Sequence, residues 1–222
     1  MRLPFPLPGL RVLAALAIAC ALLQSQAFDA ERMLVAAQRI GPQAVLGARA
    51  VQALLAGAGG LDDEAKLAQV NQFYNRRIEF RDDMEVWGQV DYWASPLEML
   101  DKGKGDCEDF AIGKYFTLLA TGMPAQRLRL VYVRAAIGGS GGVTQAHMVL
   151  AYYPAPDAEP LILDNLIGDI RPARSRPDLA PVFSFNSEGL WQGVGGLSAG
   201  DPTARLSRWR EILGKARAEG FQ

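Results

Sequence analysis

The groups in this chain best suited to chemistry are one thiol and one imidazole. The sequence holds two cysteines and a single histidine, His147. Cys20 lies in an apolar N-terminal segment with the pattern of an export signal, so Cys107 is the only thiol expected in the mature chain. A lone thiol cannot form a disulfide within its own chain. Cys107 is therefore either a small buried apolar residue or a reactive group.

The surroundings of Cys107 and His147 suit a nucleophilic triad. Cys107 follows a Gly-Lys-Gly-Asp turn and opens a helical pattern, and His147 lies on an apolar, strand-like run. Asp164 ends the next apolar run. A helix N-terminus and a nearby imidazole each favour a thiolate, and a carboxylate can fix the imidazole tautomer. These three residues are therefore candidates for nucleophile, base and orienting acid.

Each of these residues also has a purely structural interpretation. A lone cysteine on an apolar helix is usually part of the core, and a lone histidine on a strand is usually a hydrogen-bonded bystander. The glycine-rich turn before Cys107 and the position of Asp164 raise the weight of the catalytic interpretation. On the residues alone, both interpretations stay open.

Three acidic residues crowd the thiol: Asp106, Glu108 and Asp109. Their negative charge should raise the pKa of Cys107, which opposes thiolate formation. One explanation is that they cap the helix and favour its first turn. The other is that they bind a hard cation such as Ca²⁺. Because the spacing matches no EF-hand loop, capping is the favoured explanation from spacing alone.

The patterns along the chain predict helices first and an antiparallel sheet afterwards. The expected helices cover 30–56 with a break at Gly41-Pro42, 62–79, 97–100, 107–120 and 203–218. The expected strands cover 127–136, the run around His147, the run that ends at Asp164, and 183–185. This order is typical of an α+β fold with Cys107 at the start of a central helix.

The domain organisation follows from the same patterns. Residues 1–27 are predicted to be a cleaved signal peptide, with lipidation of Cys20 or an uncleaved anchor as alternatives. Residues 28–222 then form a single domain, with a helical lobe over about 28–122, a β-rich lobe over about 123–195 and a C-terminal helix over about 203–218. The net charge of −1 and the lack of a basic run give no reason to expect nucleic-acid binding. No second apolar run approaches membrane-spanning length.

An ordered series of motifs resembles the bacterial transglutaminase-like cysteine proteinases, the periplasmic adhesin-cleaving proteases of the LapG type. The central motif is Gly105-Asp-Cys-Glu-Asp-Phe-Ala111. The flanking motifs are Trp87-Gly-Gln-Val-Asp-Tyr-Trp-Ala-Ser-Pro96, Leu128-Arg-Leu-Val-Tyr-Val133, Gln145-Ala-His-Met-Val-Leu-Ala-Tyr-Tyr153, Leu163-Asp-Asn165 and Pro181-Val-Phe-Ser-Phe-Asn186. The resemblance covers most of the chain from Val70 to Trp191.

The resemblance implies a papain-like or transglutaminase-like fold, with a helical lobe packed on an antiparallel sheet and the active site between them. It implies that Cys107 is the nucleophile, His147 the general base and then acid, and Asp164 the orienting carboxylate. It also implies a Ca²⁺ requirement that falls on Asp106, Glu108 and Asp109, which makes a bound Ca²⁺ the favoured interpretation of these acids.

The resemblance further implies a function in the periplasm. The family's substrate is the N-terminal region of a large surface adhesin, cut within a small-residue motif that contains two adjacent alanines, and cutting releases the adhesin and disperses biofilm. An inner-membrane cyclic-di-GMP receptor sequesters the protease through its periplasmic domain. Two other functions stay open: a transglutaminase-type acyl transferase with the same triad, and a non-catalytic periplasmic binding module with Cys107 buried.

Overall fold

The computed structural model describes residues 28–138 and 142–221. The predicted signal peptide, with Cys20 in it, lies outside the described residues. Among the helices that are described, none combines the length and apolar character needed to cross a membrane.

Three helices open the described chain: α2 (Ala30–Ile40), α3 (Pro42–Ala58) and α4 (Asp63–Arg77). The predicted break at Gly41-Pro42 separates α2 from α3, because proline has no N–H to continue the helical ladder. At the start of α3, the Asp101 carboxylate accepts a hydrogen bond from the Ala44 N–H at 3.1 Å. Asp62 caps α4 by accepting the Ala65 N–H at 2.8 Å. Local sequence signals therefore set the break before α3 and the start of α4, and the distant Asp101 adds a cap to α3.

The connector to the central helix is held by short elements. These are β1 (Glu79–Phe80), α5 (Asp83–Val86), α6 (Pro96–Lys102) and β2 (Lys104–Gly105), and β2 pairs in parallel with β1. Ser95 and Glu98 form a capping box at the start of α6. Gly103 ends α6 in the left-handed region, with φ 62°, which suits glycine. The next residues enter α7 (Cys107–Ala120), so the chain reaches Cys107 from a fixed direction.

The second half of the chain forms a sheet of seven strands. Its order is β6 (Arg171–Pro172), β5 (Leu161–Leu163), β4 (Val143–Tyr152), β3 (Leu128–Ile137), β7 (Leu179–Phe185), β8 (Leu190–Gln192) and β9 (Ser198–Gly200), and all neighbours are antiparallel. Short 3₁₀ turns over Ala125–Arg127 and Ala173–Ser175 lead into strand segments. The sheet extends to residue 200, beyond the limit of about 195 expected for the β-rich lobe.

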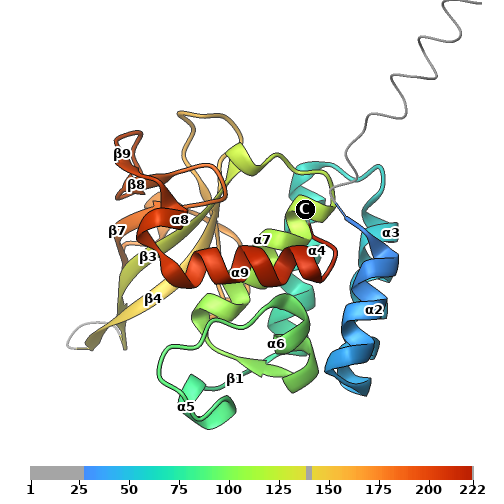
Figure 1. Cartoon of the computed structure of the whole chain (residues 1–222). Helices are drawn as coiled ribbons and strands as arrows, with labels where there is room; N and C mark the ends of the chain where they lie inside the picture. Colours follow the sequence, from blue (N-terminus) through green and yellow to red (C-terminus); the bar gives the residue numbers. More distant parts are fainter. Residues whose placement is uncertain (1–27, 139–141, 222) are drawn as a thin grey trace, which may run out of the picture.

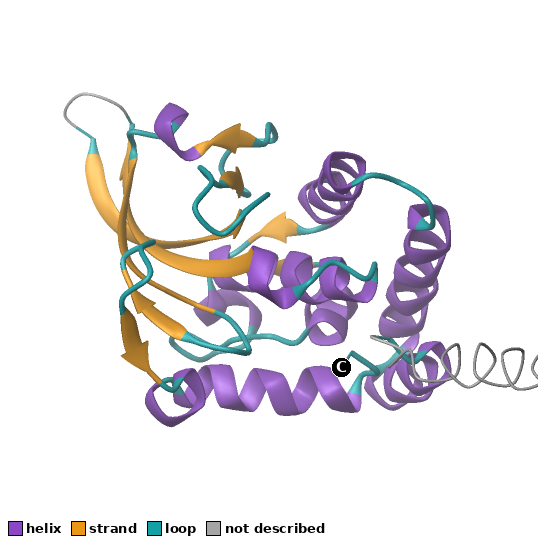
Figure 2. Ribbon diagram, turned by 90° about the horizontal axis from the view of Figure 1, so that it is seen from above, coloured by secondary structure: helices purple, strands orange, loops and turns teal. Residues whose placement is uncertain are grey.

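The helices and the sheet lie side by side, with α7 between them (Figures 1 and 2). α7 packs on α4, α6 and β4, and it is buried from Glu108 to Leu118. One large core joins side chains from α4, α7, β3, β4 and β7, among them Leu67, Ile112, Leu130, Leu150 and Phe185. The predicted α+β fold is therefore confirmed.

The single C-terminal helix expected over 203–218 is wrong. The structure has two helices instead, α8 (Pro202–Arg205) and α9 (Ser207–Ala218), separated by Leu206 in an extended conformation. Trp209 on α9 is fully buried and packs against Tyr115, Phe116 and Phe185. The break directs α9 across the molecule so that this indole reaches the core, and burial of a large aromatic side chain outweighs continuity of the helix.

One charged side chain is buried in the middle of α7. The Nζ atom of Lys114 donates to the backbone oxygen of Asp164 at 3.1 Å and lies 5.7 Å from the centre of the Phe110 ring. Burial lowers the pKa of Lys114 to about 7, and the negative charge of Asp164 opposes this shift. Lys114 therefore ties the central helix to the end of β5.

This buried lysine predicts how stability depends on pH. Its pKa falls from the ordinary 10.5 to about 7 on folding, so between these pH values the folded protein binds fewer protons than the unfolded one. Stability should then rise with pH. We expect the free energy of unfolding of the wild type, relative to Lys114→Met, to increase by a few kcal/mol, in order of magnitude, from pH 7 to about pH 10. Urea unfolding at several pH values measures it, and a constant difference would contradict the prediction.

Candidate active site

The predicted nucleophile occupies the first position of the central helix. Cys107 begins α7, and Asp106 precedes it in an extended conformation as the N-cap residue. Asp109 accepts the Asp106 N–H through Oδ2 at 3.4 Å and the Ala94 N–H through Oδ1 at 2.7 Å. Asp109 thus braces the turn against the segment before α6. The unpaired N–H groups of the first helical turn lie next to the thiol.

The predicted base and the predicted orienting acid are hydrogen-bonded. His147 Nε2 lies 2.8 Å from Asp164 Oδ1, and both side chains are buried. His147 lies on β4, and Asp164 follows the last residue of β5. Because Nε2 is engaged by the carboxylate, Nδ1 is the ring nitrogen left to face a nucleophile.

Asp164 is hydrogen-bonded on every side. Its Oδ1 also accepts the Leu166 N–H at 3.1 Å, and its Oδ2 accepts Arg176 Nη2 at 2.7 Å. Its backbone oxygen accepts Lys114 Nζ and Asn75 Nδ2, at 3.1 and 2.8 Å. The carboxylate is therefore fixed relative to both the sheet and the helices.

The surroundings keep Asp164 ionised. Burial by itself would raise its pKa, but His147, the Leu166 N–H and Arg176 outweigh burial and lower the pKa to about 2. Arg176, itself buried, also pairs with Asp178 through Nη2 at 2.7 Å and Nε at 3.0 Å. Neither Arg176 nor Lys114 was singled out from the sequence, since no local pattern distinguishes a buried arginine or lysine from an exposed one.

Cys107 and His147 line the same cleft. Its volume is about 730 Å³, and its other lining side chains include Trp93, Tyr132 and Phe183. Within residues 28–138 and 142–221, no hydrogen bond joins the thiol to the imidazole, and Cys107 Sγ instead donates to Glu108 Oε2 at 3.1 Å. The structure thus brings the three predicted residues to one site, with the thiol turned toward an acid.

Burial and negative charge oppose ionisation of this thiol. Burial raises the pKa of Cys107 well above its ordinary value, and Glu108 and Asp106 raise it further, while the Met148 backbone N–H favours the thiolate. Burial also raises the pKa of Asp106 to about 10, with Glu108 and Asp109 adding to the effect. The site as described therefore concentrates more negative charge than its residues can compensate.

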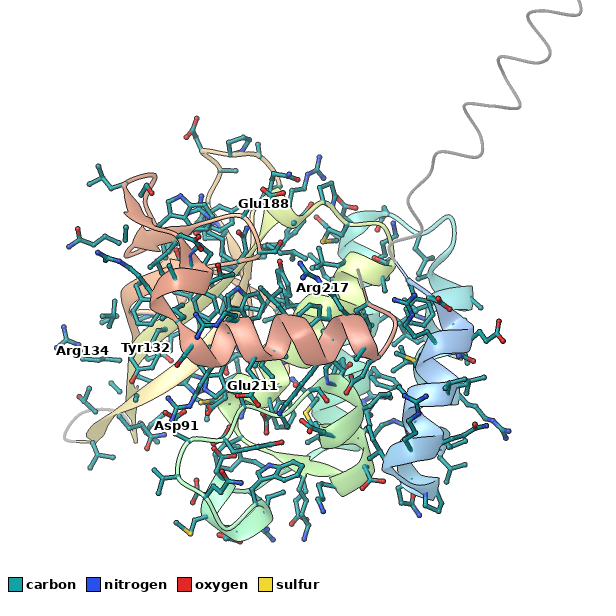
Figure 3. All side chains as sticks on the ribbon, viewed as in Figure 1. Asp91, Tyr132, Arg134, Glu188, Glu211 and Arg217 are labelled. Carbon is teal, nitrogen blue, oxygen red and sulfur yellow. The ribbon has the colours of Figure 1, made fainter. Side chains whose placement is uncertain are left out.

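The acids beside Cys107 are joined by two from the connector. Asp106 and Asp109 group with Asp83, while Glu108 groups with Asp83 and Asp91, and within each group the carboxylate oxygens lie within 4.8 Å of one another. Burial raises the pKa of Asp83 to about 6. Asp91 lies beside α9, where Arg208 pairs with it at 3.0 Å (Figure 3). No metal role was assigned to Asp83 or Asp91 from the sequence, because their spacing from Cys107 gives no sign that they lie beside it.

The cluster has unsatisfied buried oxygens. Asp83 Oδ1 and Asp106 Oδ1 are both buried and have no hydrogen-bond partner among the described residues. A buried carboxylate oxygen without a donor is costly, and a hard cation satisfies it. The residues therefore fit a calcium ion, and capping alone leaves these two oxygens unexplained.

The buried Arg176 predicts a large loss of stability on substitution. Arg176→Met leaves the carboxylates of Asp164 and Asp178 without their cation, and we expect a loss of about 3–5 kcal/mol in the free energy of unfolding. Arg171→Met is the matched control, since Arg171 pairs with Asp169 at the surface and should change stability by less than about 1 kcal/mol. Guanidinium unfolding of both variants measures the difference, and equal losses would refute a structural role for the buried pair.

Comparison with known proteins places this site in a family. The family model described as bacterial transglutaminase-like cysteine proteinase matches residues 59–178, which include Cys107, His147 and Asp164. A comparison with curated proteins gave no match.

Solved structures agree with the family model. The chain is similar to Legionella pneumophila LapG, with 39% sequence identity over 84% of this chain and 97% of that chain and a TM-score of 0.71. The EGTA-treated form of that protein gives 39% identity, the same coverage and a TM-score of 0.74. Its calcium-bound form gives 38% identity over 84% of this chain and 98% of that chain, with a TM-score of 0.72. The chain therefore belongs to the bacterial transglutaminase-like cysteine proteinases and is a cysteine peptidase of the LapG type.

Proposed function

We propose that this protein is a calcium-dependent periplasmic cysteine endopeptidase that cuts the N-terminal region of a large surface adhesin, with Cys107, His147 and Asp164 as its triad. The observation that carries the proposal is the shared cleft, where the first residue of α7 meets a histidine already hydrogen-bonded to a buried carboxylate. A thiol and an imidazole in one cleft, with a buried carboxylate hydrogen-bonded to the imidazole, are the parts of a cysteine peptidase.

The proposed mechanism gives each residue of the triad a step. His147 uses Nδ1 to take the proton of Cys107, because its Nε2 is bonded to Asp164. The thiol first breaks its hydrogen bond to the Glu108 carboxylate. The thiolate that forms then attacks the scissile carbonyl carbon. The backbone N–H of Cys107, at the helix N-terminus, stabilises the developing oxyanion.

The remaining steps return the site to its starting state. His147 gives its proton to the leaving amine, and the C–N bond breaks to give an acyl-enzyme on Cys107. A water molecule, deprotonated by His147, then attacks the thioester and releases the new carboxylate and the free thiol. Asp164, whose pKa is lowered to about 2, stays ionised throughout and stabilises the imidazolium.

Asp106 and Glu108, which flank the thiol, are the proposed calcium ligands, with Asp83 and Asp91 from the connector. Asp109 lies in the same cluster, but the N–H groups of Ala94 and Asp106 already bond to both of its oxygens. When bound, Ca²⁺ supplies positive charge beside the thiol and braces the connector against α7. The calcium-bound form of Legionella pneumophila LapG supports calcium binding by this chain.

The substrate, the regulator and the location rest on membership of the LapG type. We infer cleavage of an adhesin at a small-residue motif and sequestration by the periplasmic domain of an inner-membrane cyclic-di-GMP receptor. A triad of this kind also supports acyl transfer to an amine, and a binding module needs no triad at all. Products of the reaction separate these functions, because an endopeptidase shortens its substrate and a transglutaminase cross-links it.

The proposed function predicts cleavage that needs both the thiol and calcium. The mature protein, incubated with a purified adhesin N-terminal fragment in Ca²⁺, should give two discrete shorter products on a denaturing gel. Cys107→Ala and His147→Ala should fold normally and reduce the rate at least about 10³-fold, because the nucleophile or its base is lost.

EGTA should abolish cleavage by metal-stripped wild-type protein, and added Ca²⁺ should restore it. Cleavage that ignores EGTA would reject the calcium role, near wild-type cleavage by either variant would reject the mechanism, and cross-linked products would identify an acyl transferase.

The composition of the calcium site can be tested without activity. Titration calorimetry of metal-free Cys107→Ala protein with Ca²⁺ should give one site, and adding Asp83→Asn should weaken its Kd at least tenfold, about 1.4 kcal/mol. Asp82→Asn is the matched control, because Asp82 is adjacent to Asp83 but exposed and outside the acidic groups. Equal Kd values for the two variants would exclude Asp83 as a ligand.

A further inference from the structure

Most of β4 has a neighbouring strand on only one side. β3 pairs with β4 along its whole length, from Val143 to Tyr152, whereas β5 pairs only with residues 150–152. Residues 143–149 therefore have no neighbouring strand on the side where β5 would continue, and the exposed residues 143–146 form an open edge of the sheet there. An open edge presents unpaired backbone N–H and C=O groups that can pair with another chain.

The register shows which residues point their backbone groups outward. Just after β4, the Tyr153 N–H donates to the Arg127 oxygen at 2.8 Å, on the side of β3. Because the direction of the backbone groups alternates along a strand, the odd-numbered residues of β4 direct their N–H and C=O groups at β3. Even-numbered residues direct theirs to the opposite side, and the Met148 N–H accordingly faces Cys107. Thr144 and Ala146 therefore present their N–H and C=O groups at the open edge.

These backbone groups are free to pair. The register turns these groups away from β3, β5 does not reach them, and no hydrogen bond outside the sheet joins them to another group within residues 28–138 and 142–221. Both residues are exposed, while His147 and the residues that follow it on β4 are buried. Exposed and unpaired backbone of this kind is a template for an added strand.

The open edge leads directly to the reacting groups. Gln145, Ala146, His147 and Met148 line the cleft that also holds Cys107. A chain laid along Thr144 and Ala146 continues past the imidazole and meets the thiol one residue later, at Met148. The chain that binds along this edge is consequently the protein substrate.

We propose that the protein substrate binds as an extended strand along the open edge of β4, exchanging backbone hydrogen bonds with Thr144 and Ala146 and so aligning its scissile carbonyl with Cys107. This inference rests on the proposed endopeptidase function and adds the conformation of the substrate to it. Main-chain hydrogen bonds of this kind supply affinity that does not depend on the side chains of the substrate.

The pairing predicts an alternating response to methylation of the substrate backbone. The probe is a 14-residue peptide centred on the bond cut in the adhesin fragment, with one amide nitrogen methylated in each member of a series. N-methylation at the two substrate residues opposite Thr144 and Ala146, which are two positions apart, should lower kcat/KM at least tenfold. Methylation at the residue between them should lower it less than threefold, because that N–H points away from β4.

A pair of enzyme variants tests the same backbone pairing by changing β4 instead of the substrate. Thr144→Pro removes an N–H that β3 does not use, and proline is tolerated on such an edge. It should lower kcat/KM for the unmethylated peptide at least tenfold. Thr144→Ala keeps the N–H, and its kcat/KM should exceed that of Thr144→Pro at least threefold. The rate of Cys107 alkylation by iodoacetamide and the melting temperature should be the same in both variants, which shows that the fold and the nucleophile are intact.

The possible outcomes test the strand inference and the proposed endopeptidase function separately. Failure of the wild type to cut the unmethylated peptide or the adhesin fragment would overturn the proposed function, and the strand inference with it. Cleavage of the peptide with no alternation in the methylated series, or equal kcat/KM for Thr144→Pro and Thr144→Ala, would overturn the inference and leave the endopeptidase function standing. Concentration-dependent dimers lost in Thr144→Pro would assign the edge to a second copy of this chain instead.

Discussion

The hydrogen bonds to Asp164 are the interaction on which the rest of the site depends. The Asp164 carboxylate is hydrogen-bonded to Arg176 and His147. Its backbone oxygen accepts hydrogen bonds from Lys114 and Asn75. The donors come from two helices, one strand and a loop before β7. A buried carboxylate is tolerated only when donors and cations compensate it, so helices and sheet must meet in one arrangement to form the site.

The acidic residues around Cys107 divide into two roles. Asp109 uses both oxygens to hold backbone N–H groups, which is the capping role that spacing favoured. Asp83 and Asp106 each keep a buried oxygen with no donor among the described residues. Carboxylates that repel one another and the thiolate are costly in a protein that must form a thiolate. The proposed calcium site accounts for these charges, because a divalent cation offsets carboxylates beside the proposed nucleophile.

Local signals determined most of the secondary structure. Pro42, Asp62, Ser95 and Gly103 set helix boundaries through contacts within a few residues, and sequence reasoning placed α2, α3, α4, α6 and α7 to within about two residues. The prediction of one C-terminal helix was wrong because burial of Trp209 among residues of α7 and β7 decided the break at Leu206. That contact joins residues far apart in the chain and leaves no local pattern.

The sequence by itself determined the chemistry that is present: one thiol at a helix start, one imidazole on a strand and a carboxylate after the next strand. Residue type and local periodicity are enough for that. Only the tertiary structure decided that Asp83 and Asp91 join the acids beside Cys107. It also decided that Arg176 and Lys114 reach Asp164. The structure alone shows that β5 stops short of the part of β4 that carries His147. These features depend on how helices and strands pack, because packing sets distances between residues that no sequence spacing relates.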